Sequence, residues 1–327
     1  MNRIADVNMG VYAMRAEWIA GLAAALALST SMSAAPAFAD YPERPVTFIV
    51  PWPPGDIEDQ LTRVIAEEMS KETGVPAKVV NRPGGGAVEG ATAVAQSDPD
   101  GYTIGSFVID VPTMHIIRAN ATYTRESFEP IGIFMTYPFA LVTLKDKPYE
   151  TLSELAEYAK SNPVTLAHFG YDLIPSMATF AAAKQLGFSY SADAAYEMVD
   201  CSTLKNGDAD VMNTTMQLVL SCLDDLTILA AYTAEPLSIA PDAPLLSSQV
   251  PGMDLTLWNG LFVPKGTPQE IKDKIAAIAE KAIGSDKAET IVRPSGAPIY
   301  WLDSDESAAR INADYEKAEE ILKFLEN

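Results

Sequence analysis

The stretch FIVPWPPGDIEDQLTRVIAEEM (residues 48–69), followed by VVNRPGGGAVEGATAVA (residues 79–95) and DPDGYTIGSF (residues 98–107), decides the fold. Each of the first two begins as an apolar, β-branched run, breaks at proline and glycine, and resumes as a helical pattern. Strand, helix, strand, helix and strand at this spacing predict right-handed βαβ units and a parallel sheet. Ligands of such sheets bind at the carboxyl ends of the strands, where both glycine-containing loops lie.

The alternation of strands and helices continues after this stretch and predicts a second α/β unit. A long apolar run at residues 131–144 precedes a helix that opens with the capping pattern of Thr151 and Glu154. A second long apolar run, at residues 255–264, leads to the closing helices, so the two runs are suited to two crossings between lobes. We expect the other elements to be strands at residues 165–169, 209–212 and 227–232, and helices at residues 176–185, 268–283 and 304–325.

The first 39 residues have the layout of a cleaved secretory signal. Arg15 precedes an apolar segment at residues 18–28, and the small-residue ending Ala37-Phe38-Ala39 follows. That apolar segment is too short for a membrane anchor, since a spanning helix needs about 20 residues. We therefore expect cleavage after Ala39 and an exported, soluble mature chain.

Charge and composition exclude several classes of function. The net charge of −21 repels nucleic acid and anionic lipid headgroups, so neither is an expected partner. The chain has only two histidines, His115 and His168, and lacks the HExxH, CxxC and GxSxG patterns. We therefore predict no catalytic residues, no metal site and no cofactor, which leaves a periplasmic hydrolase as a remote alternative.

The two cysteines, Cys201 and Cys222, both lie in the expected mature chain. An oxidising compartment would allow them to form a disulfide across a loop of about 20 residues, which would stabilise the fold by roughly 3 kcal/mol. The alternative is two separately buried thiols, because the sequence does not supply the Cα separation that decides between them.

Four motifs in register resemble one family. YPERPVTFIVPWPPG, NRPGGG, DPDGYT and WNGLFVPKGTP are similar, in order and spacing, to the periplasmic substrate-binding proteins of tripartite tricarboxylate transporters, the Bug or TctC-like family. The resemblance covers residues 41–326. It implies a two-lobed, type II Venus-flytrap fold of the α/β class, with lobe 1 at residues 40–142 and 254–327, lobe 2 at residues 143–253, and two crossover strands. It also implies a monomer that delivers a small organic acid to a permease with one large and one small membrane subunit.

The loops that hold the ligand carboxylate in that family depart from its pattern here. The family's first loop usually reads PxxPGGxxD, but Asp56 stands where the second glycine is expected and Glu58 where a small polar residue is usual. Its second-lobe loop commonly reads GxGSxxH, and only Gly170 of that pattern is retained. The predicted ligand-binding residues are Trp52, Pro54, Gly55, Asp56, Ile57, Glu58, Gly84, Gly85, Asp110, Gly170, Tyr171, Asp172 and Leu173.

The added acidic residues change the expected ligand. Two like charges about 4 Å apart repel by roughly 4 kcal/mol at an effective dielectric of about 20, so Asp56, Glu58 and Asp172 would weaken the binding of a plain dicarboxylate. We expect instead a ligand that is amine-bearing, neutral or bridged by a cation such as Ca²⁺. Alternatively, these acids point outward or cap the helix that starts near Glu58.

A second class of function is a periplasmic sensor that presents its closed form to a signalling receptor.

Overall fold

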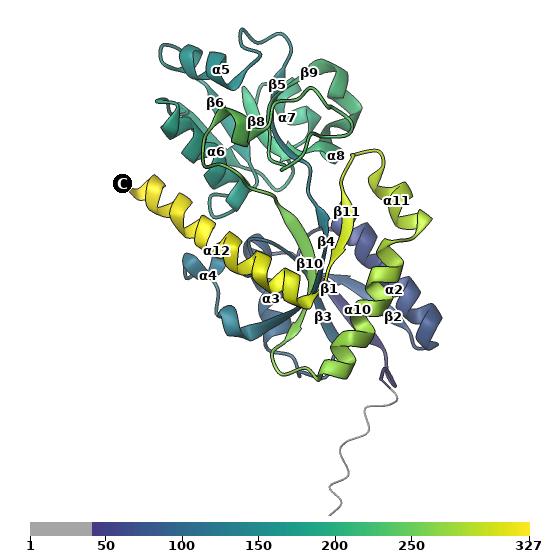
Figure 1. Cartoon of the computed structure of the whole chain (residues 1–327). Coiled ribbons are helices and arrows are strands. Elements are labelled where there is room, and N and C mark those ends of the chain that lie inside the picture. Colours follow the sequence, from purple (N-terminus) through teal and green to yellow (C-terminus); the bar gives the residue numbers. More distant parts are fainter. Residues whose placement is uncertain (1–40) are drawn as a thin grey trace, which may run out of the picture. The chain divides into compact units, whose positions relative to one another are not determined.

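The computed structural model of the protein describes residues 41–327, so the expected signal peptide at residues 1–39 lies outside the described part. Among residues 41–327, no helix combines the length and the apolar character that a membrane crossing requires. The described chain forms two sheets with helices around each of them (Figure 1).

The first sheet has six strands in the order β11-β4-β10-β3-β1-β2. Strand β1 pairs in parallel with β2 and with β3, as the βαβ pattern predicted, whereas β10 runs antiparallel to β3 and β4. The strands are β1 (Val46–Val50), β2 (Ala77–Asn81), β3 (Thr103–Val108), β4 (Phe128–Thr136), β10 (Trp258–Pro264) and β11 (Ile299–Leu302).

Helix α2 (Ile57–Thr73) shows why the opening stretch folds as predicted. The side chain of Asp56 caps its first turn, and Leu61, Ile65 and Met69 are fully buried on one face. The helix ends at Gly74, whose φ of 70° is left-handed and favours glycine. The other α-helices of this lobe are α3 (Val88–Ala95), α4 (Met114–Ile117), α10 (Gln269–Ile283), α11 (Asp286–Val292) and α12 (Ser304–Glu326).

The second sheet has five strands in the order β7-β6-β8-β5-β9. Strand β6 pairs in parallel with β7 and β8, and the predicted capping box of Thr151 and Glu154 opens α5. The strands are β5 (Phe139–Leu144), β6 (Thr165–His168), β7 (Ala192–Ala195), β8 (Val211–Thr215) and β9 (Leu226–Ala231). The helices are α5 (Leu152–Ala159), α6 (Ile174–Gln185), α7 (Cys201–Lys205), α8 (Met216–Val219) and α9 (Leu246–Gln249).

Two segments connect the lobes that carry these sheets. The chain leaves the first sheet after β4 and enters the second at β5, so by strand membership the crossing lies at Tyr137 and Pro138, ahead of the expected boundary at residue 142. It returns before β10, where Trp258 is fully buried and donates its Nε1–H to Asp314 Oδ2 of α12 at 2.6 Å. Trp258 therefore fixes the return segment to the C-terminal helix.

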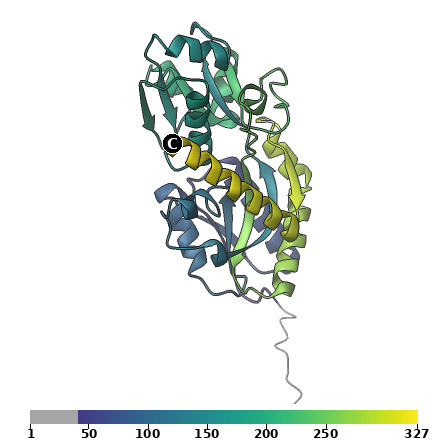
Figure 2. The same cartoon turned by 60° about the vertical axis from the view of Figure 1, so that its left-hand side comes forward.

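Helix α12 contacts both lobes. It packs on β4 of the first sheet and on α6 of the second lobe, and α12 and α6 lie side by side in both views (Figures 1 and 2). At its C-terminal end, Lys184 Nζ donates hydrogen bonds to the backbone carbonyls of Phe324, at 2.9 Å, and Leu325, at 3.2 Å. A cation beside the last carbonyls of a helix is favourable, because those carbonyls lack partners within the helix.

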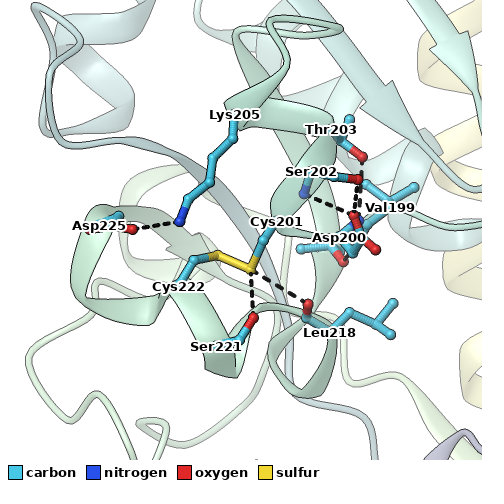
Figure 3. Close-up of a disulfide and its surroundings, with 11 residues drawn as sticks. Val199, Asp200, Cys201, Ser202, Thr203, Lys205, Leu218, Ser221, Cys222 and Asp225 are labelled. Carbon is cyan, nitrogen blue, oxygen red and sulfur yellow. Dashed lines mark hydrogen bonds and ion pairs between the residues drawn. A yellow bond between two sulfur atoms is a disulfide. The ribbon is translucent and has the colours of Figure 1, made fainter.

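Cys201 and Cys222 form a disulfide with a Cα–Cα distance of 6.0 Å, and it joins α7 to the short 3-10 helix η3 (Leu220–Asp225) (Figure 3). The hydroxyl of Ser221 lies 3.2 Å from Cys201 Sγ and donates to it, because a disulfide sulfur has no proton to give. An ion pair between Lys205 and Asp225, at 2.7 Å, links the same two segments.

Candidate functional site

A cavity of about 70 Å³ lies where the carboxyl ends of strands from both sheets meet. The segments that follow β1, β3 and β6 contribute to its wall, and so does the last residue of β8. The lining residues are Trp52, Asp56, Glu58, Val108, Ile109, Asp110, Tyr137, Phe139, Phe169, Leu173, Pro175, Thr215, Leu257 and Trp258. This position is the one that the parallel-sheet rule predicts for a ligand.

In the first loop, two backbone N–H groups are bound by the protein's own carboxylates. The N–H of Ile57 donates to Asp56 Oδ1 at 2.7 Å, and the N–H of Gly55 donates to Asp59 Oδ2 at 2.9 Å. Burial would raise the pKa of Asp59, but hydrogen bonds from Arg63, Gly55 N–H and Asn81 together lower it. The Asp59 carboxylate therefore has a structural role: its hydrogen bonds hold the first loop in place.

In the second-lobe loop, two backbone N–H groups also donate to side chains, one to a carboxylate and one to a histidine. The N–H of Ile174, which opens α6, donates to Asp110 Oδ1 across the two lobes at 2.6 Å. The N–H of Gly170 donates to His168 Nδ1 at 3.1 Å. Burial raises the pKa of Asp110 to about 7, and the bond from Ile174 partly counters that effect.

Asp56 and Glu58 both line the cavity, in different surroundings. Asp56 caps α2 and also accepts a hydrogen bond from Gln217 Nε2 of the second lobe, while burial raises its pKa to about 6. Glu58 is 0% exposed, and neither of its carboxylate oxygens has a hydrogen-bond partner among the described residues. Burial raises the pKa of Glu58 well above its usual value, and the charges of Asp56 and Asp59 raise it further.

Asp172 and Tyr171 lie outside the cavity wall. Asp172 accepts hydrogen bonds from Arg118 Nε and Asn120 Nδ2, both at 2.9 Å, and so joins the second lobe to the first. The side chain of Tyr171 is 54% exposed. The sequence placed the start of the following helix at residue 176, and α6 begins two residues earlier, at Ile174.

Some of the remaining predicted ligand-binding residues line the cavity, and others do not. Trp52 and Leu173 line the cavity with the acids described above, while Pro54, Gly55, Ile57 and Gly170 do not. Gly84 and Gly85, in the loop after β2, also lie outside the cavity wall. They form the turn before α3, with φ values of 140° and 58°.

Apart from Trp52, the sequence missed the aromatic part of the wall. Tyr137 and Phe139 flank Pro138 at the first crossing, Phe169 follows β6, and Trp258 is the first residue of β10. The only signal was the pair of aromatic residues around a proline within the apolar run at residues 131–144. Within residues 41–327, no three His, Cys, Asp or Glu side chains are grouped so that they could hold a metal ion.

Solved structures with the same two-lobed fold include the periplasmic binding protein BugD, with a TM-score of 0.75 and 26% identity over 87% of this chain and 98% of that one. They also include MatC from Rhodopseudomonas palustris, solved with bound malate, with a TM-score of 0.76 and 24% identity over 86% of this chain and 99% of that one. The fold is thus that of a two-lobed periplasmic binding protein, as the resemblance implied.

Sequence relatives agree with this fold. A protein encoded between tcbD and tcbE in Pseudomonas sp. strain P51 is 29% identical over 82% of this chain and 81% of its own length. BugT of Bordetella pertussis is 27% identical over 75% of this chain and 78% of its own length. Residues 61–326 match the profile of the tripartite tricarboxylate transporter family receptor. The chain therefore belongs to the receptor family of the tripartite tricarboxylate transporters.

Proposed function

We propose that this protein is a periplasmic, monomeric receptor that closes on a small organic solute and delivers it to the large and small membrane subunits of a tripartite tricarboxylate permease. The family consists of solute-binding receptors and not of enzymes, which supports the receptor role. The cavity between lobes joined by two segments supports hinge closure on a ligand. Removal of residues 1–39 on export belongs to the same proposal.

We further propose that the solute is not a simple di- or tricarboxylate. The observation that carries this is the state of the four loop donors, because Gly55, Ile57, Gly170 and Ile174 all give their N–H groups to side chains of the protein itself. Three of these four acceptors are carboxylates. A ligand carboxylate would have to displace them to reach the same amides.

The charge of the wall supports the same proposal. Asp56, Glu58 and Asp110 line the cavity, and the described lining residues include no lysine, arginine or histidine. A ligand carboxylate finds no cationic side chain in this wall, and any wall acid that is ionised repels it, by roughly 4 kcal/mol at about 4 Å and an effective dielectric of about 20. The ligand classes that avoid this repulsion are amine-bearing, neutral and cation-bridged solutes.

Thermal-shift screening of chelator-treated protein tests the ligand class. A true ligand at about 100 times its Kd should stabilise the protein by about 2.7 kcal/mol. We expect amine-bearing or neutral solutes to give larger shifts in melting temperature than succinate, malate or citrate. A parallel series of measurements adds calcium. A largest shift with succinate, malate or citrate in the absence of metal would contradict the proposal.

Two aromatic variants test whether this cavity is the binding site. Trp52 lines the cavity, whereas Tyr171, which the sequence had also placed at the ligand, is exposed outside it. We expect Trp52→Ala to weaken binding of the solute that native mass spectrometry finds on the purified protein by about tenfold or more, and Tyr171→Ala to leave it unchanged. Equal losses in the two variants would place the site elsewhere.

A further inference from the structure

Glu58 is the one cavity acid for which the protein supplies no counterpart among the described residues. Asp56 accepts from Ile57 N–H and Gln217, and Asp110 accepts from Ile174 N–H, but both oxygens of the fully buried Glu58 lack a partner. An unpaired carboxylate in such a place is strongly unfavourable. A carboxyl group at this position is therefore suited to a partner that comes from outside the chain.

The wall around Glu58 is aromatic. Five rings line the cavity, and they come from both lobes and both connecting segments: Trp52, Tyr137, Phe139, Phe169 and Trp258. Phe139 is in edge contact with Tyr137 and with Phe169, with ring centroids 6.0 Å apart in each pair. Aromatic faces attract organic cations, and groups of rings are the usual cage for ammonium ligands. Ca²⁺ and Mg²⁺ prefer oxygen ligands, so the rings favour an organic cation over a bridging metal.

Resting on the proposed receptor function, we propose that the solute is a compact organic ammonium compound whose charged nitrogen pairs with Glu58 and whose carbon body packs against the aromatic wall. A cavity of about 70 Å³ has room for roughly five to seven water-sized groups, because one such group needs about 10–15 Å³. The ligand is therefore small, of the size of choline or n-pentylammonium. Asp56, which lies in the same wall, adds to the negative potential at the nitrogen.

Binding of an ammonium ion should also change the protonation of Glu58, which can be measured separately from affinity. Burial raises the pKa of Glu58, so the ligand-free protein keeps a proton on this carboxyl to a higher pH than an exposed glutamate does. When an ammonium ion binds, the carboxyl O–H releases its proton to solvent and the resulting carboxylate pairs with the cation. A neutral solute leaves that proton in place. The other titratable groups that act on Glu58 or share its cavity are Asp56, Asp59, Asp110 and Tyr137, so the proton must be assigned with a Glu58 variant.

The test is calorimetric titration of the full mature protein with matched probes at pH ~6.5, in two buffers of different ionisation enthalpy. The probes are choline with its neutral carbon analogue 3,3-dimethylbutan-1-ol, n-pentylammonium with 1-pentanol, and pentanoate as the anion. We expect an ammonium probe to bind at least about tenfold more tightly than its neutral partner, with net proton release. Equal or tighter binding of the neutral partners or of pentanoate, or no binding of either ammonium probe, overturns the inference.

Two variants assign the effect. We expect Glu58→Gln to lose about tenfold or more in ammonium affinity together with most of the proton release, while Glu150→Gln, an exposed glutamate outside the cavity, keeps both. Unchanged proton release in a folded Glu58→Gln protein overturns the role of Glu58. The probe comparison in the unmodified protein does not depend on the folding of either variant.

Tight binding of a non-ammonium solute would refute this inference and leave the receptor function standing. A protein that retains and binds no small solute at all would refute both.

Discussion

We expect Asp110, which accepts a hydrogen bond between the lobes, to make the stability of the protein dependent on pH. Its carboxylate accepts the N–H of Ile174 at 2.6 Å, and its side chain is only 5% exposed. We expect replacement by asparagine, which keeps an oxygen acceptor and removes the titration, to make the stability of the protein less sensitive to pH than that of the unmodified chain.

The magnitude follows from the shift in pKa. In the folded protein, burial raises the pKa of Asp110 from 3.8 to about 7. Between these values the folded protein holds a proton that the unfolded chain has lost, so the free energy of unfolding falls as the pH rises from about 4 to about 7. At about 1.4 kcal/mol for each pKa unit, this one group accounts for a loss on the order of 4 kcal/mol, fully present above pH ~7.

Urea unfolding at a series of pH values from ~4 to ~8 measures this effect as the difference between the unmodified protein and Asp110→Asn. The difference cancels contributions from Asp56 and Glu58, which remain in both proteins. Asp98→Asn, which changes an exposed carboxyl in the same lobe, is the matched control. Stability curves for the unmodified protein and Asp110→Asn that run parallel across this range would refute the reasoning.

Three further changes have expected outcomes. Replacing both Cys201 and Cys222 by serine should lower the free energy of unfolding by roughly 3 kcal/mol, since the loop between them is about 20 residues long; a loss below ~1 kcal/mol in urea titrations would contradict this. Asp59→Asn should destabilise the protein by about 1–3 kcal/mol at neutral pH, because the Asp59 carboxylate is bound by Arg63, Gly55 N–H and Asn81. Because these bonds lower the pKa of Asp59, the difference should shrink as the pH falls through that pKa, which thermal unfolding at acid pH checks. Asp172→Asn should change stability by less than about 1 kcal/mol, since its pair with Arg118 is partly exposed, and a larger loss in urea unfolding would show a stronger link between the lobes.

The sequence predicted the fold well where the signals are local. The β-branched run before Pro51, the cap at Asp56 and the left-handed Gly74 lie close together in the chain, and β1 and α2 form there in the predicted order of strand and helix. Strand β7 was missed because Ala192–Ala195 is mostly exposed and has the sequence ADAA, which carries no alternating apolar pattern. The strand expected at residues 209–212 lies at Val211–Thr215, and α8 follows it directly.

The candidate site was harder to predict because its wall comes from distant segments. The acids of the first loop were found from their departure from a motif, and the structure shows that Asp56 both caps α2 and lines the cavity. The position of Asp172 depends on Arg118 and Asn120, more than 50 residues away in the chain. Likewise, Tyr137 and Trp258 meet at the cavity because β4 and β10 are paired in the first sheet, with Trp258 opposite Thr136.

Helix α12 spans the joint between the lobes, and its last carbonyls are held by Lys184 of the second lobe. Under the hinge closure proposed above, anything fused after Asn327 sits beside a contact that must adjust as the lobes close. A purification tag or fluorescent label attached there would shift the balance between open and shut forms and distort the apparent affinity. Probes of bending are better attached on the exposed face of α5, around Ser153, which the structure leaves clear of that helix.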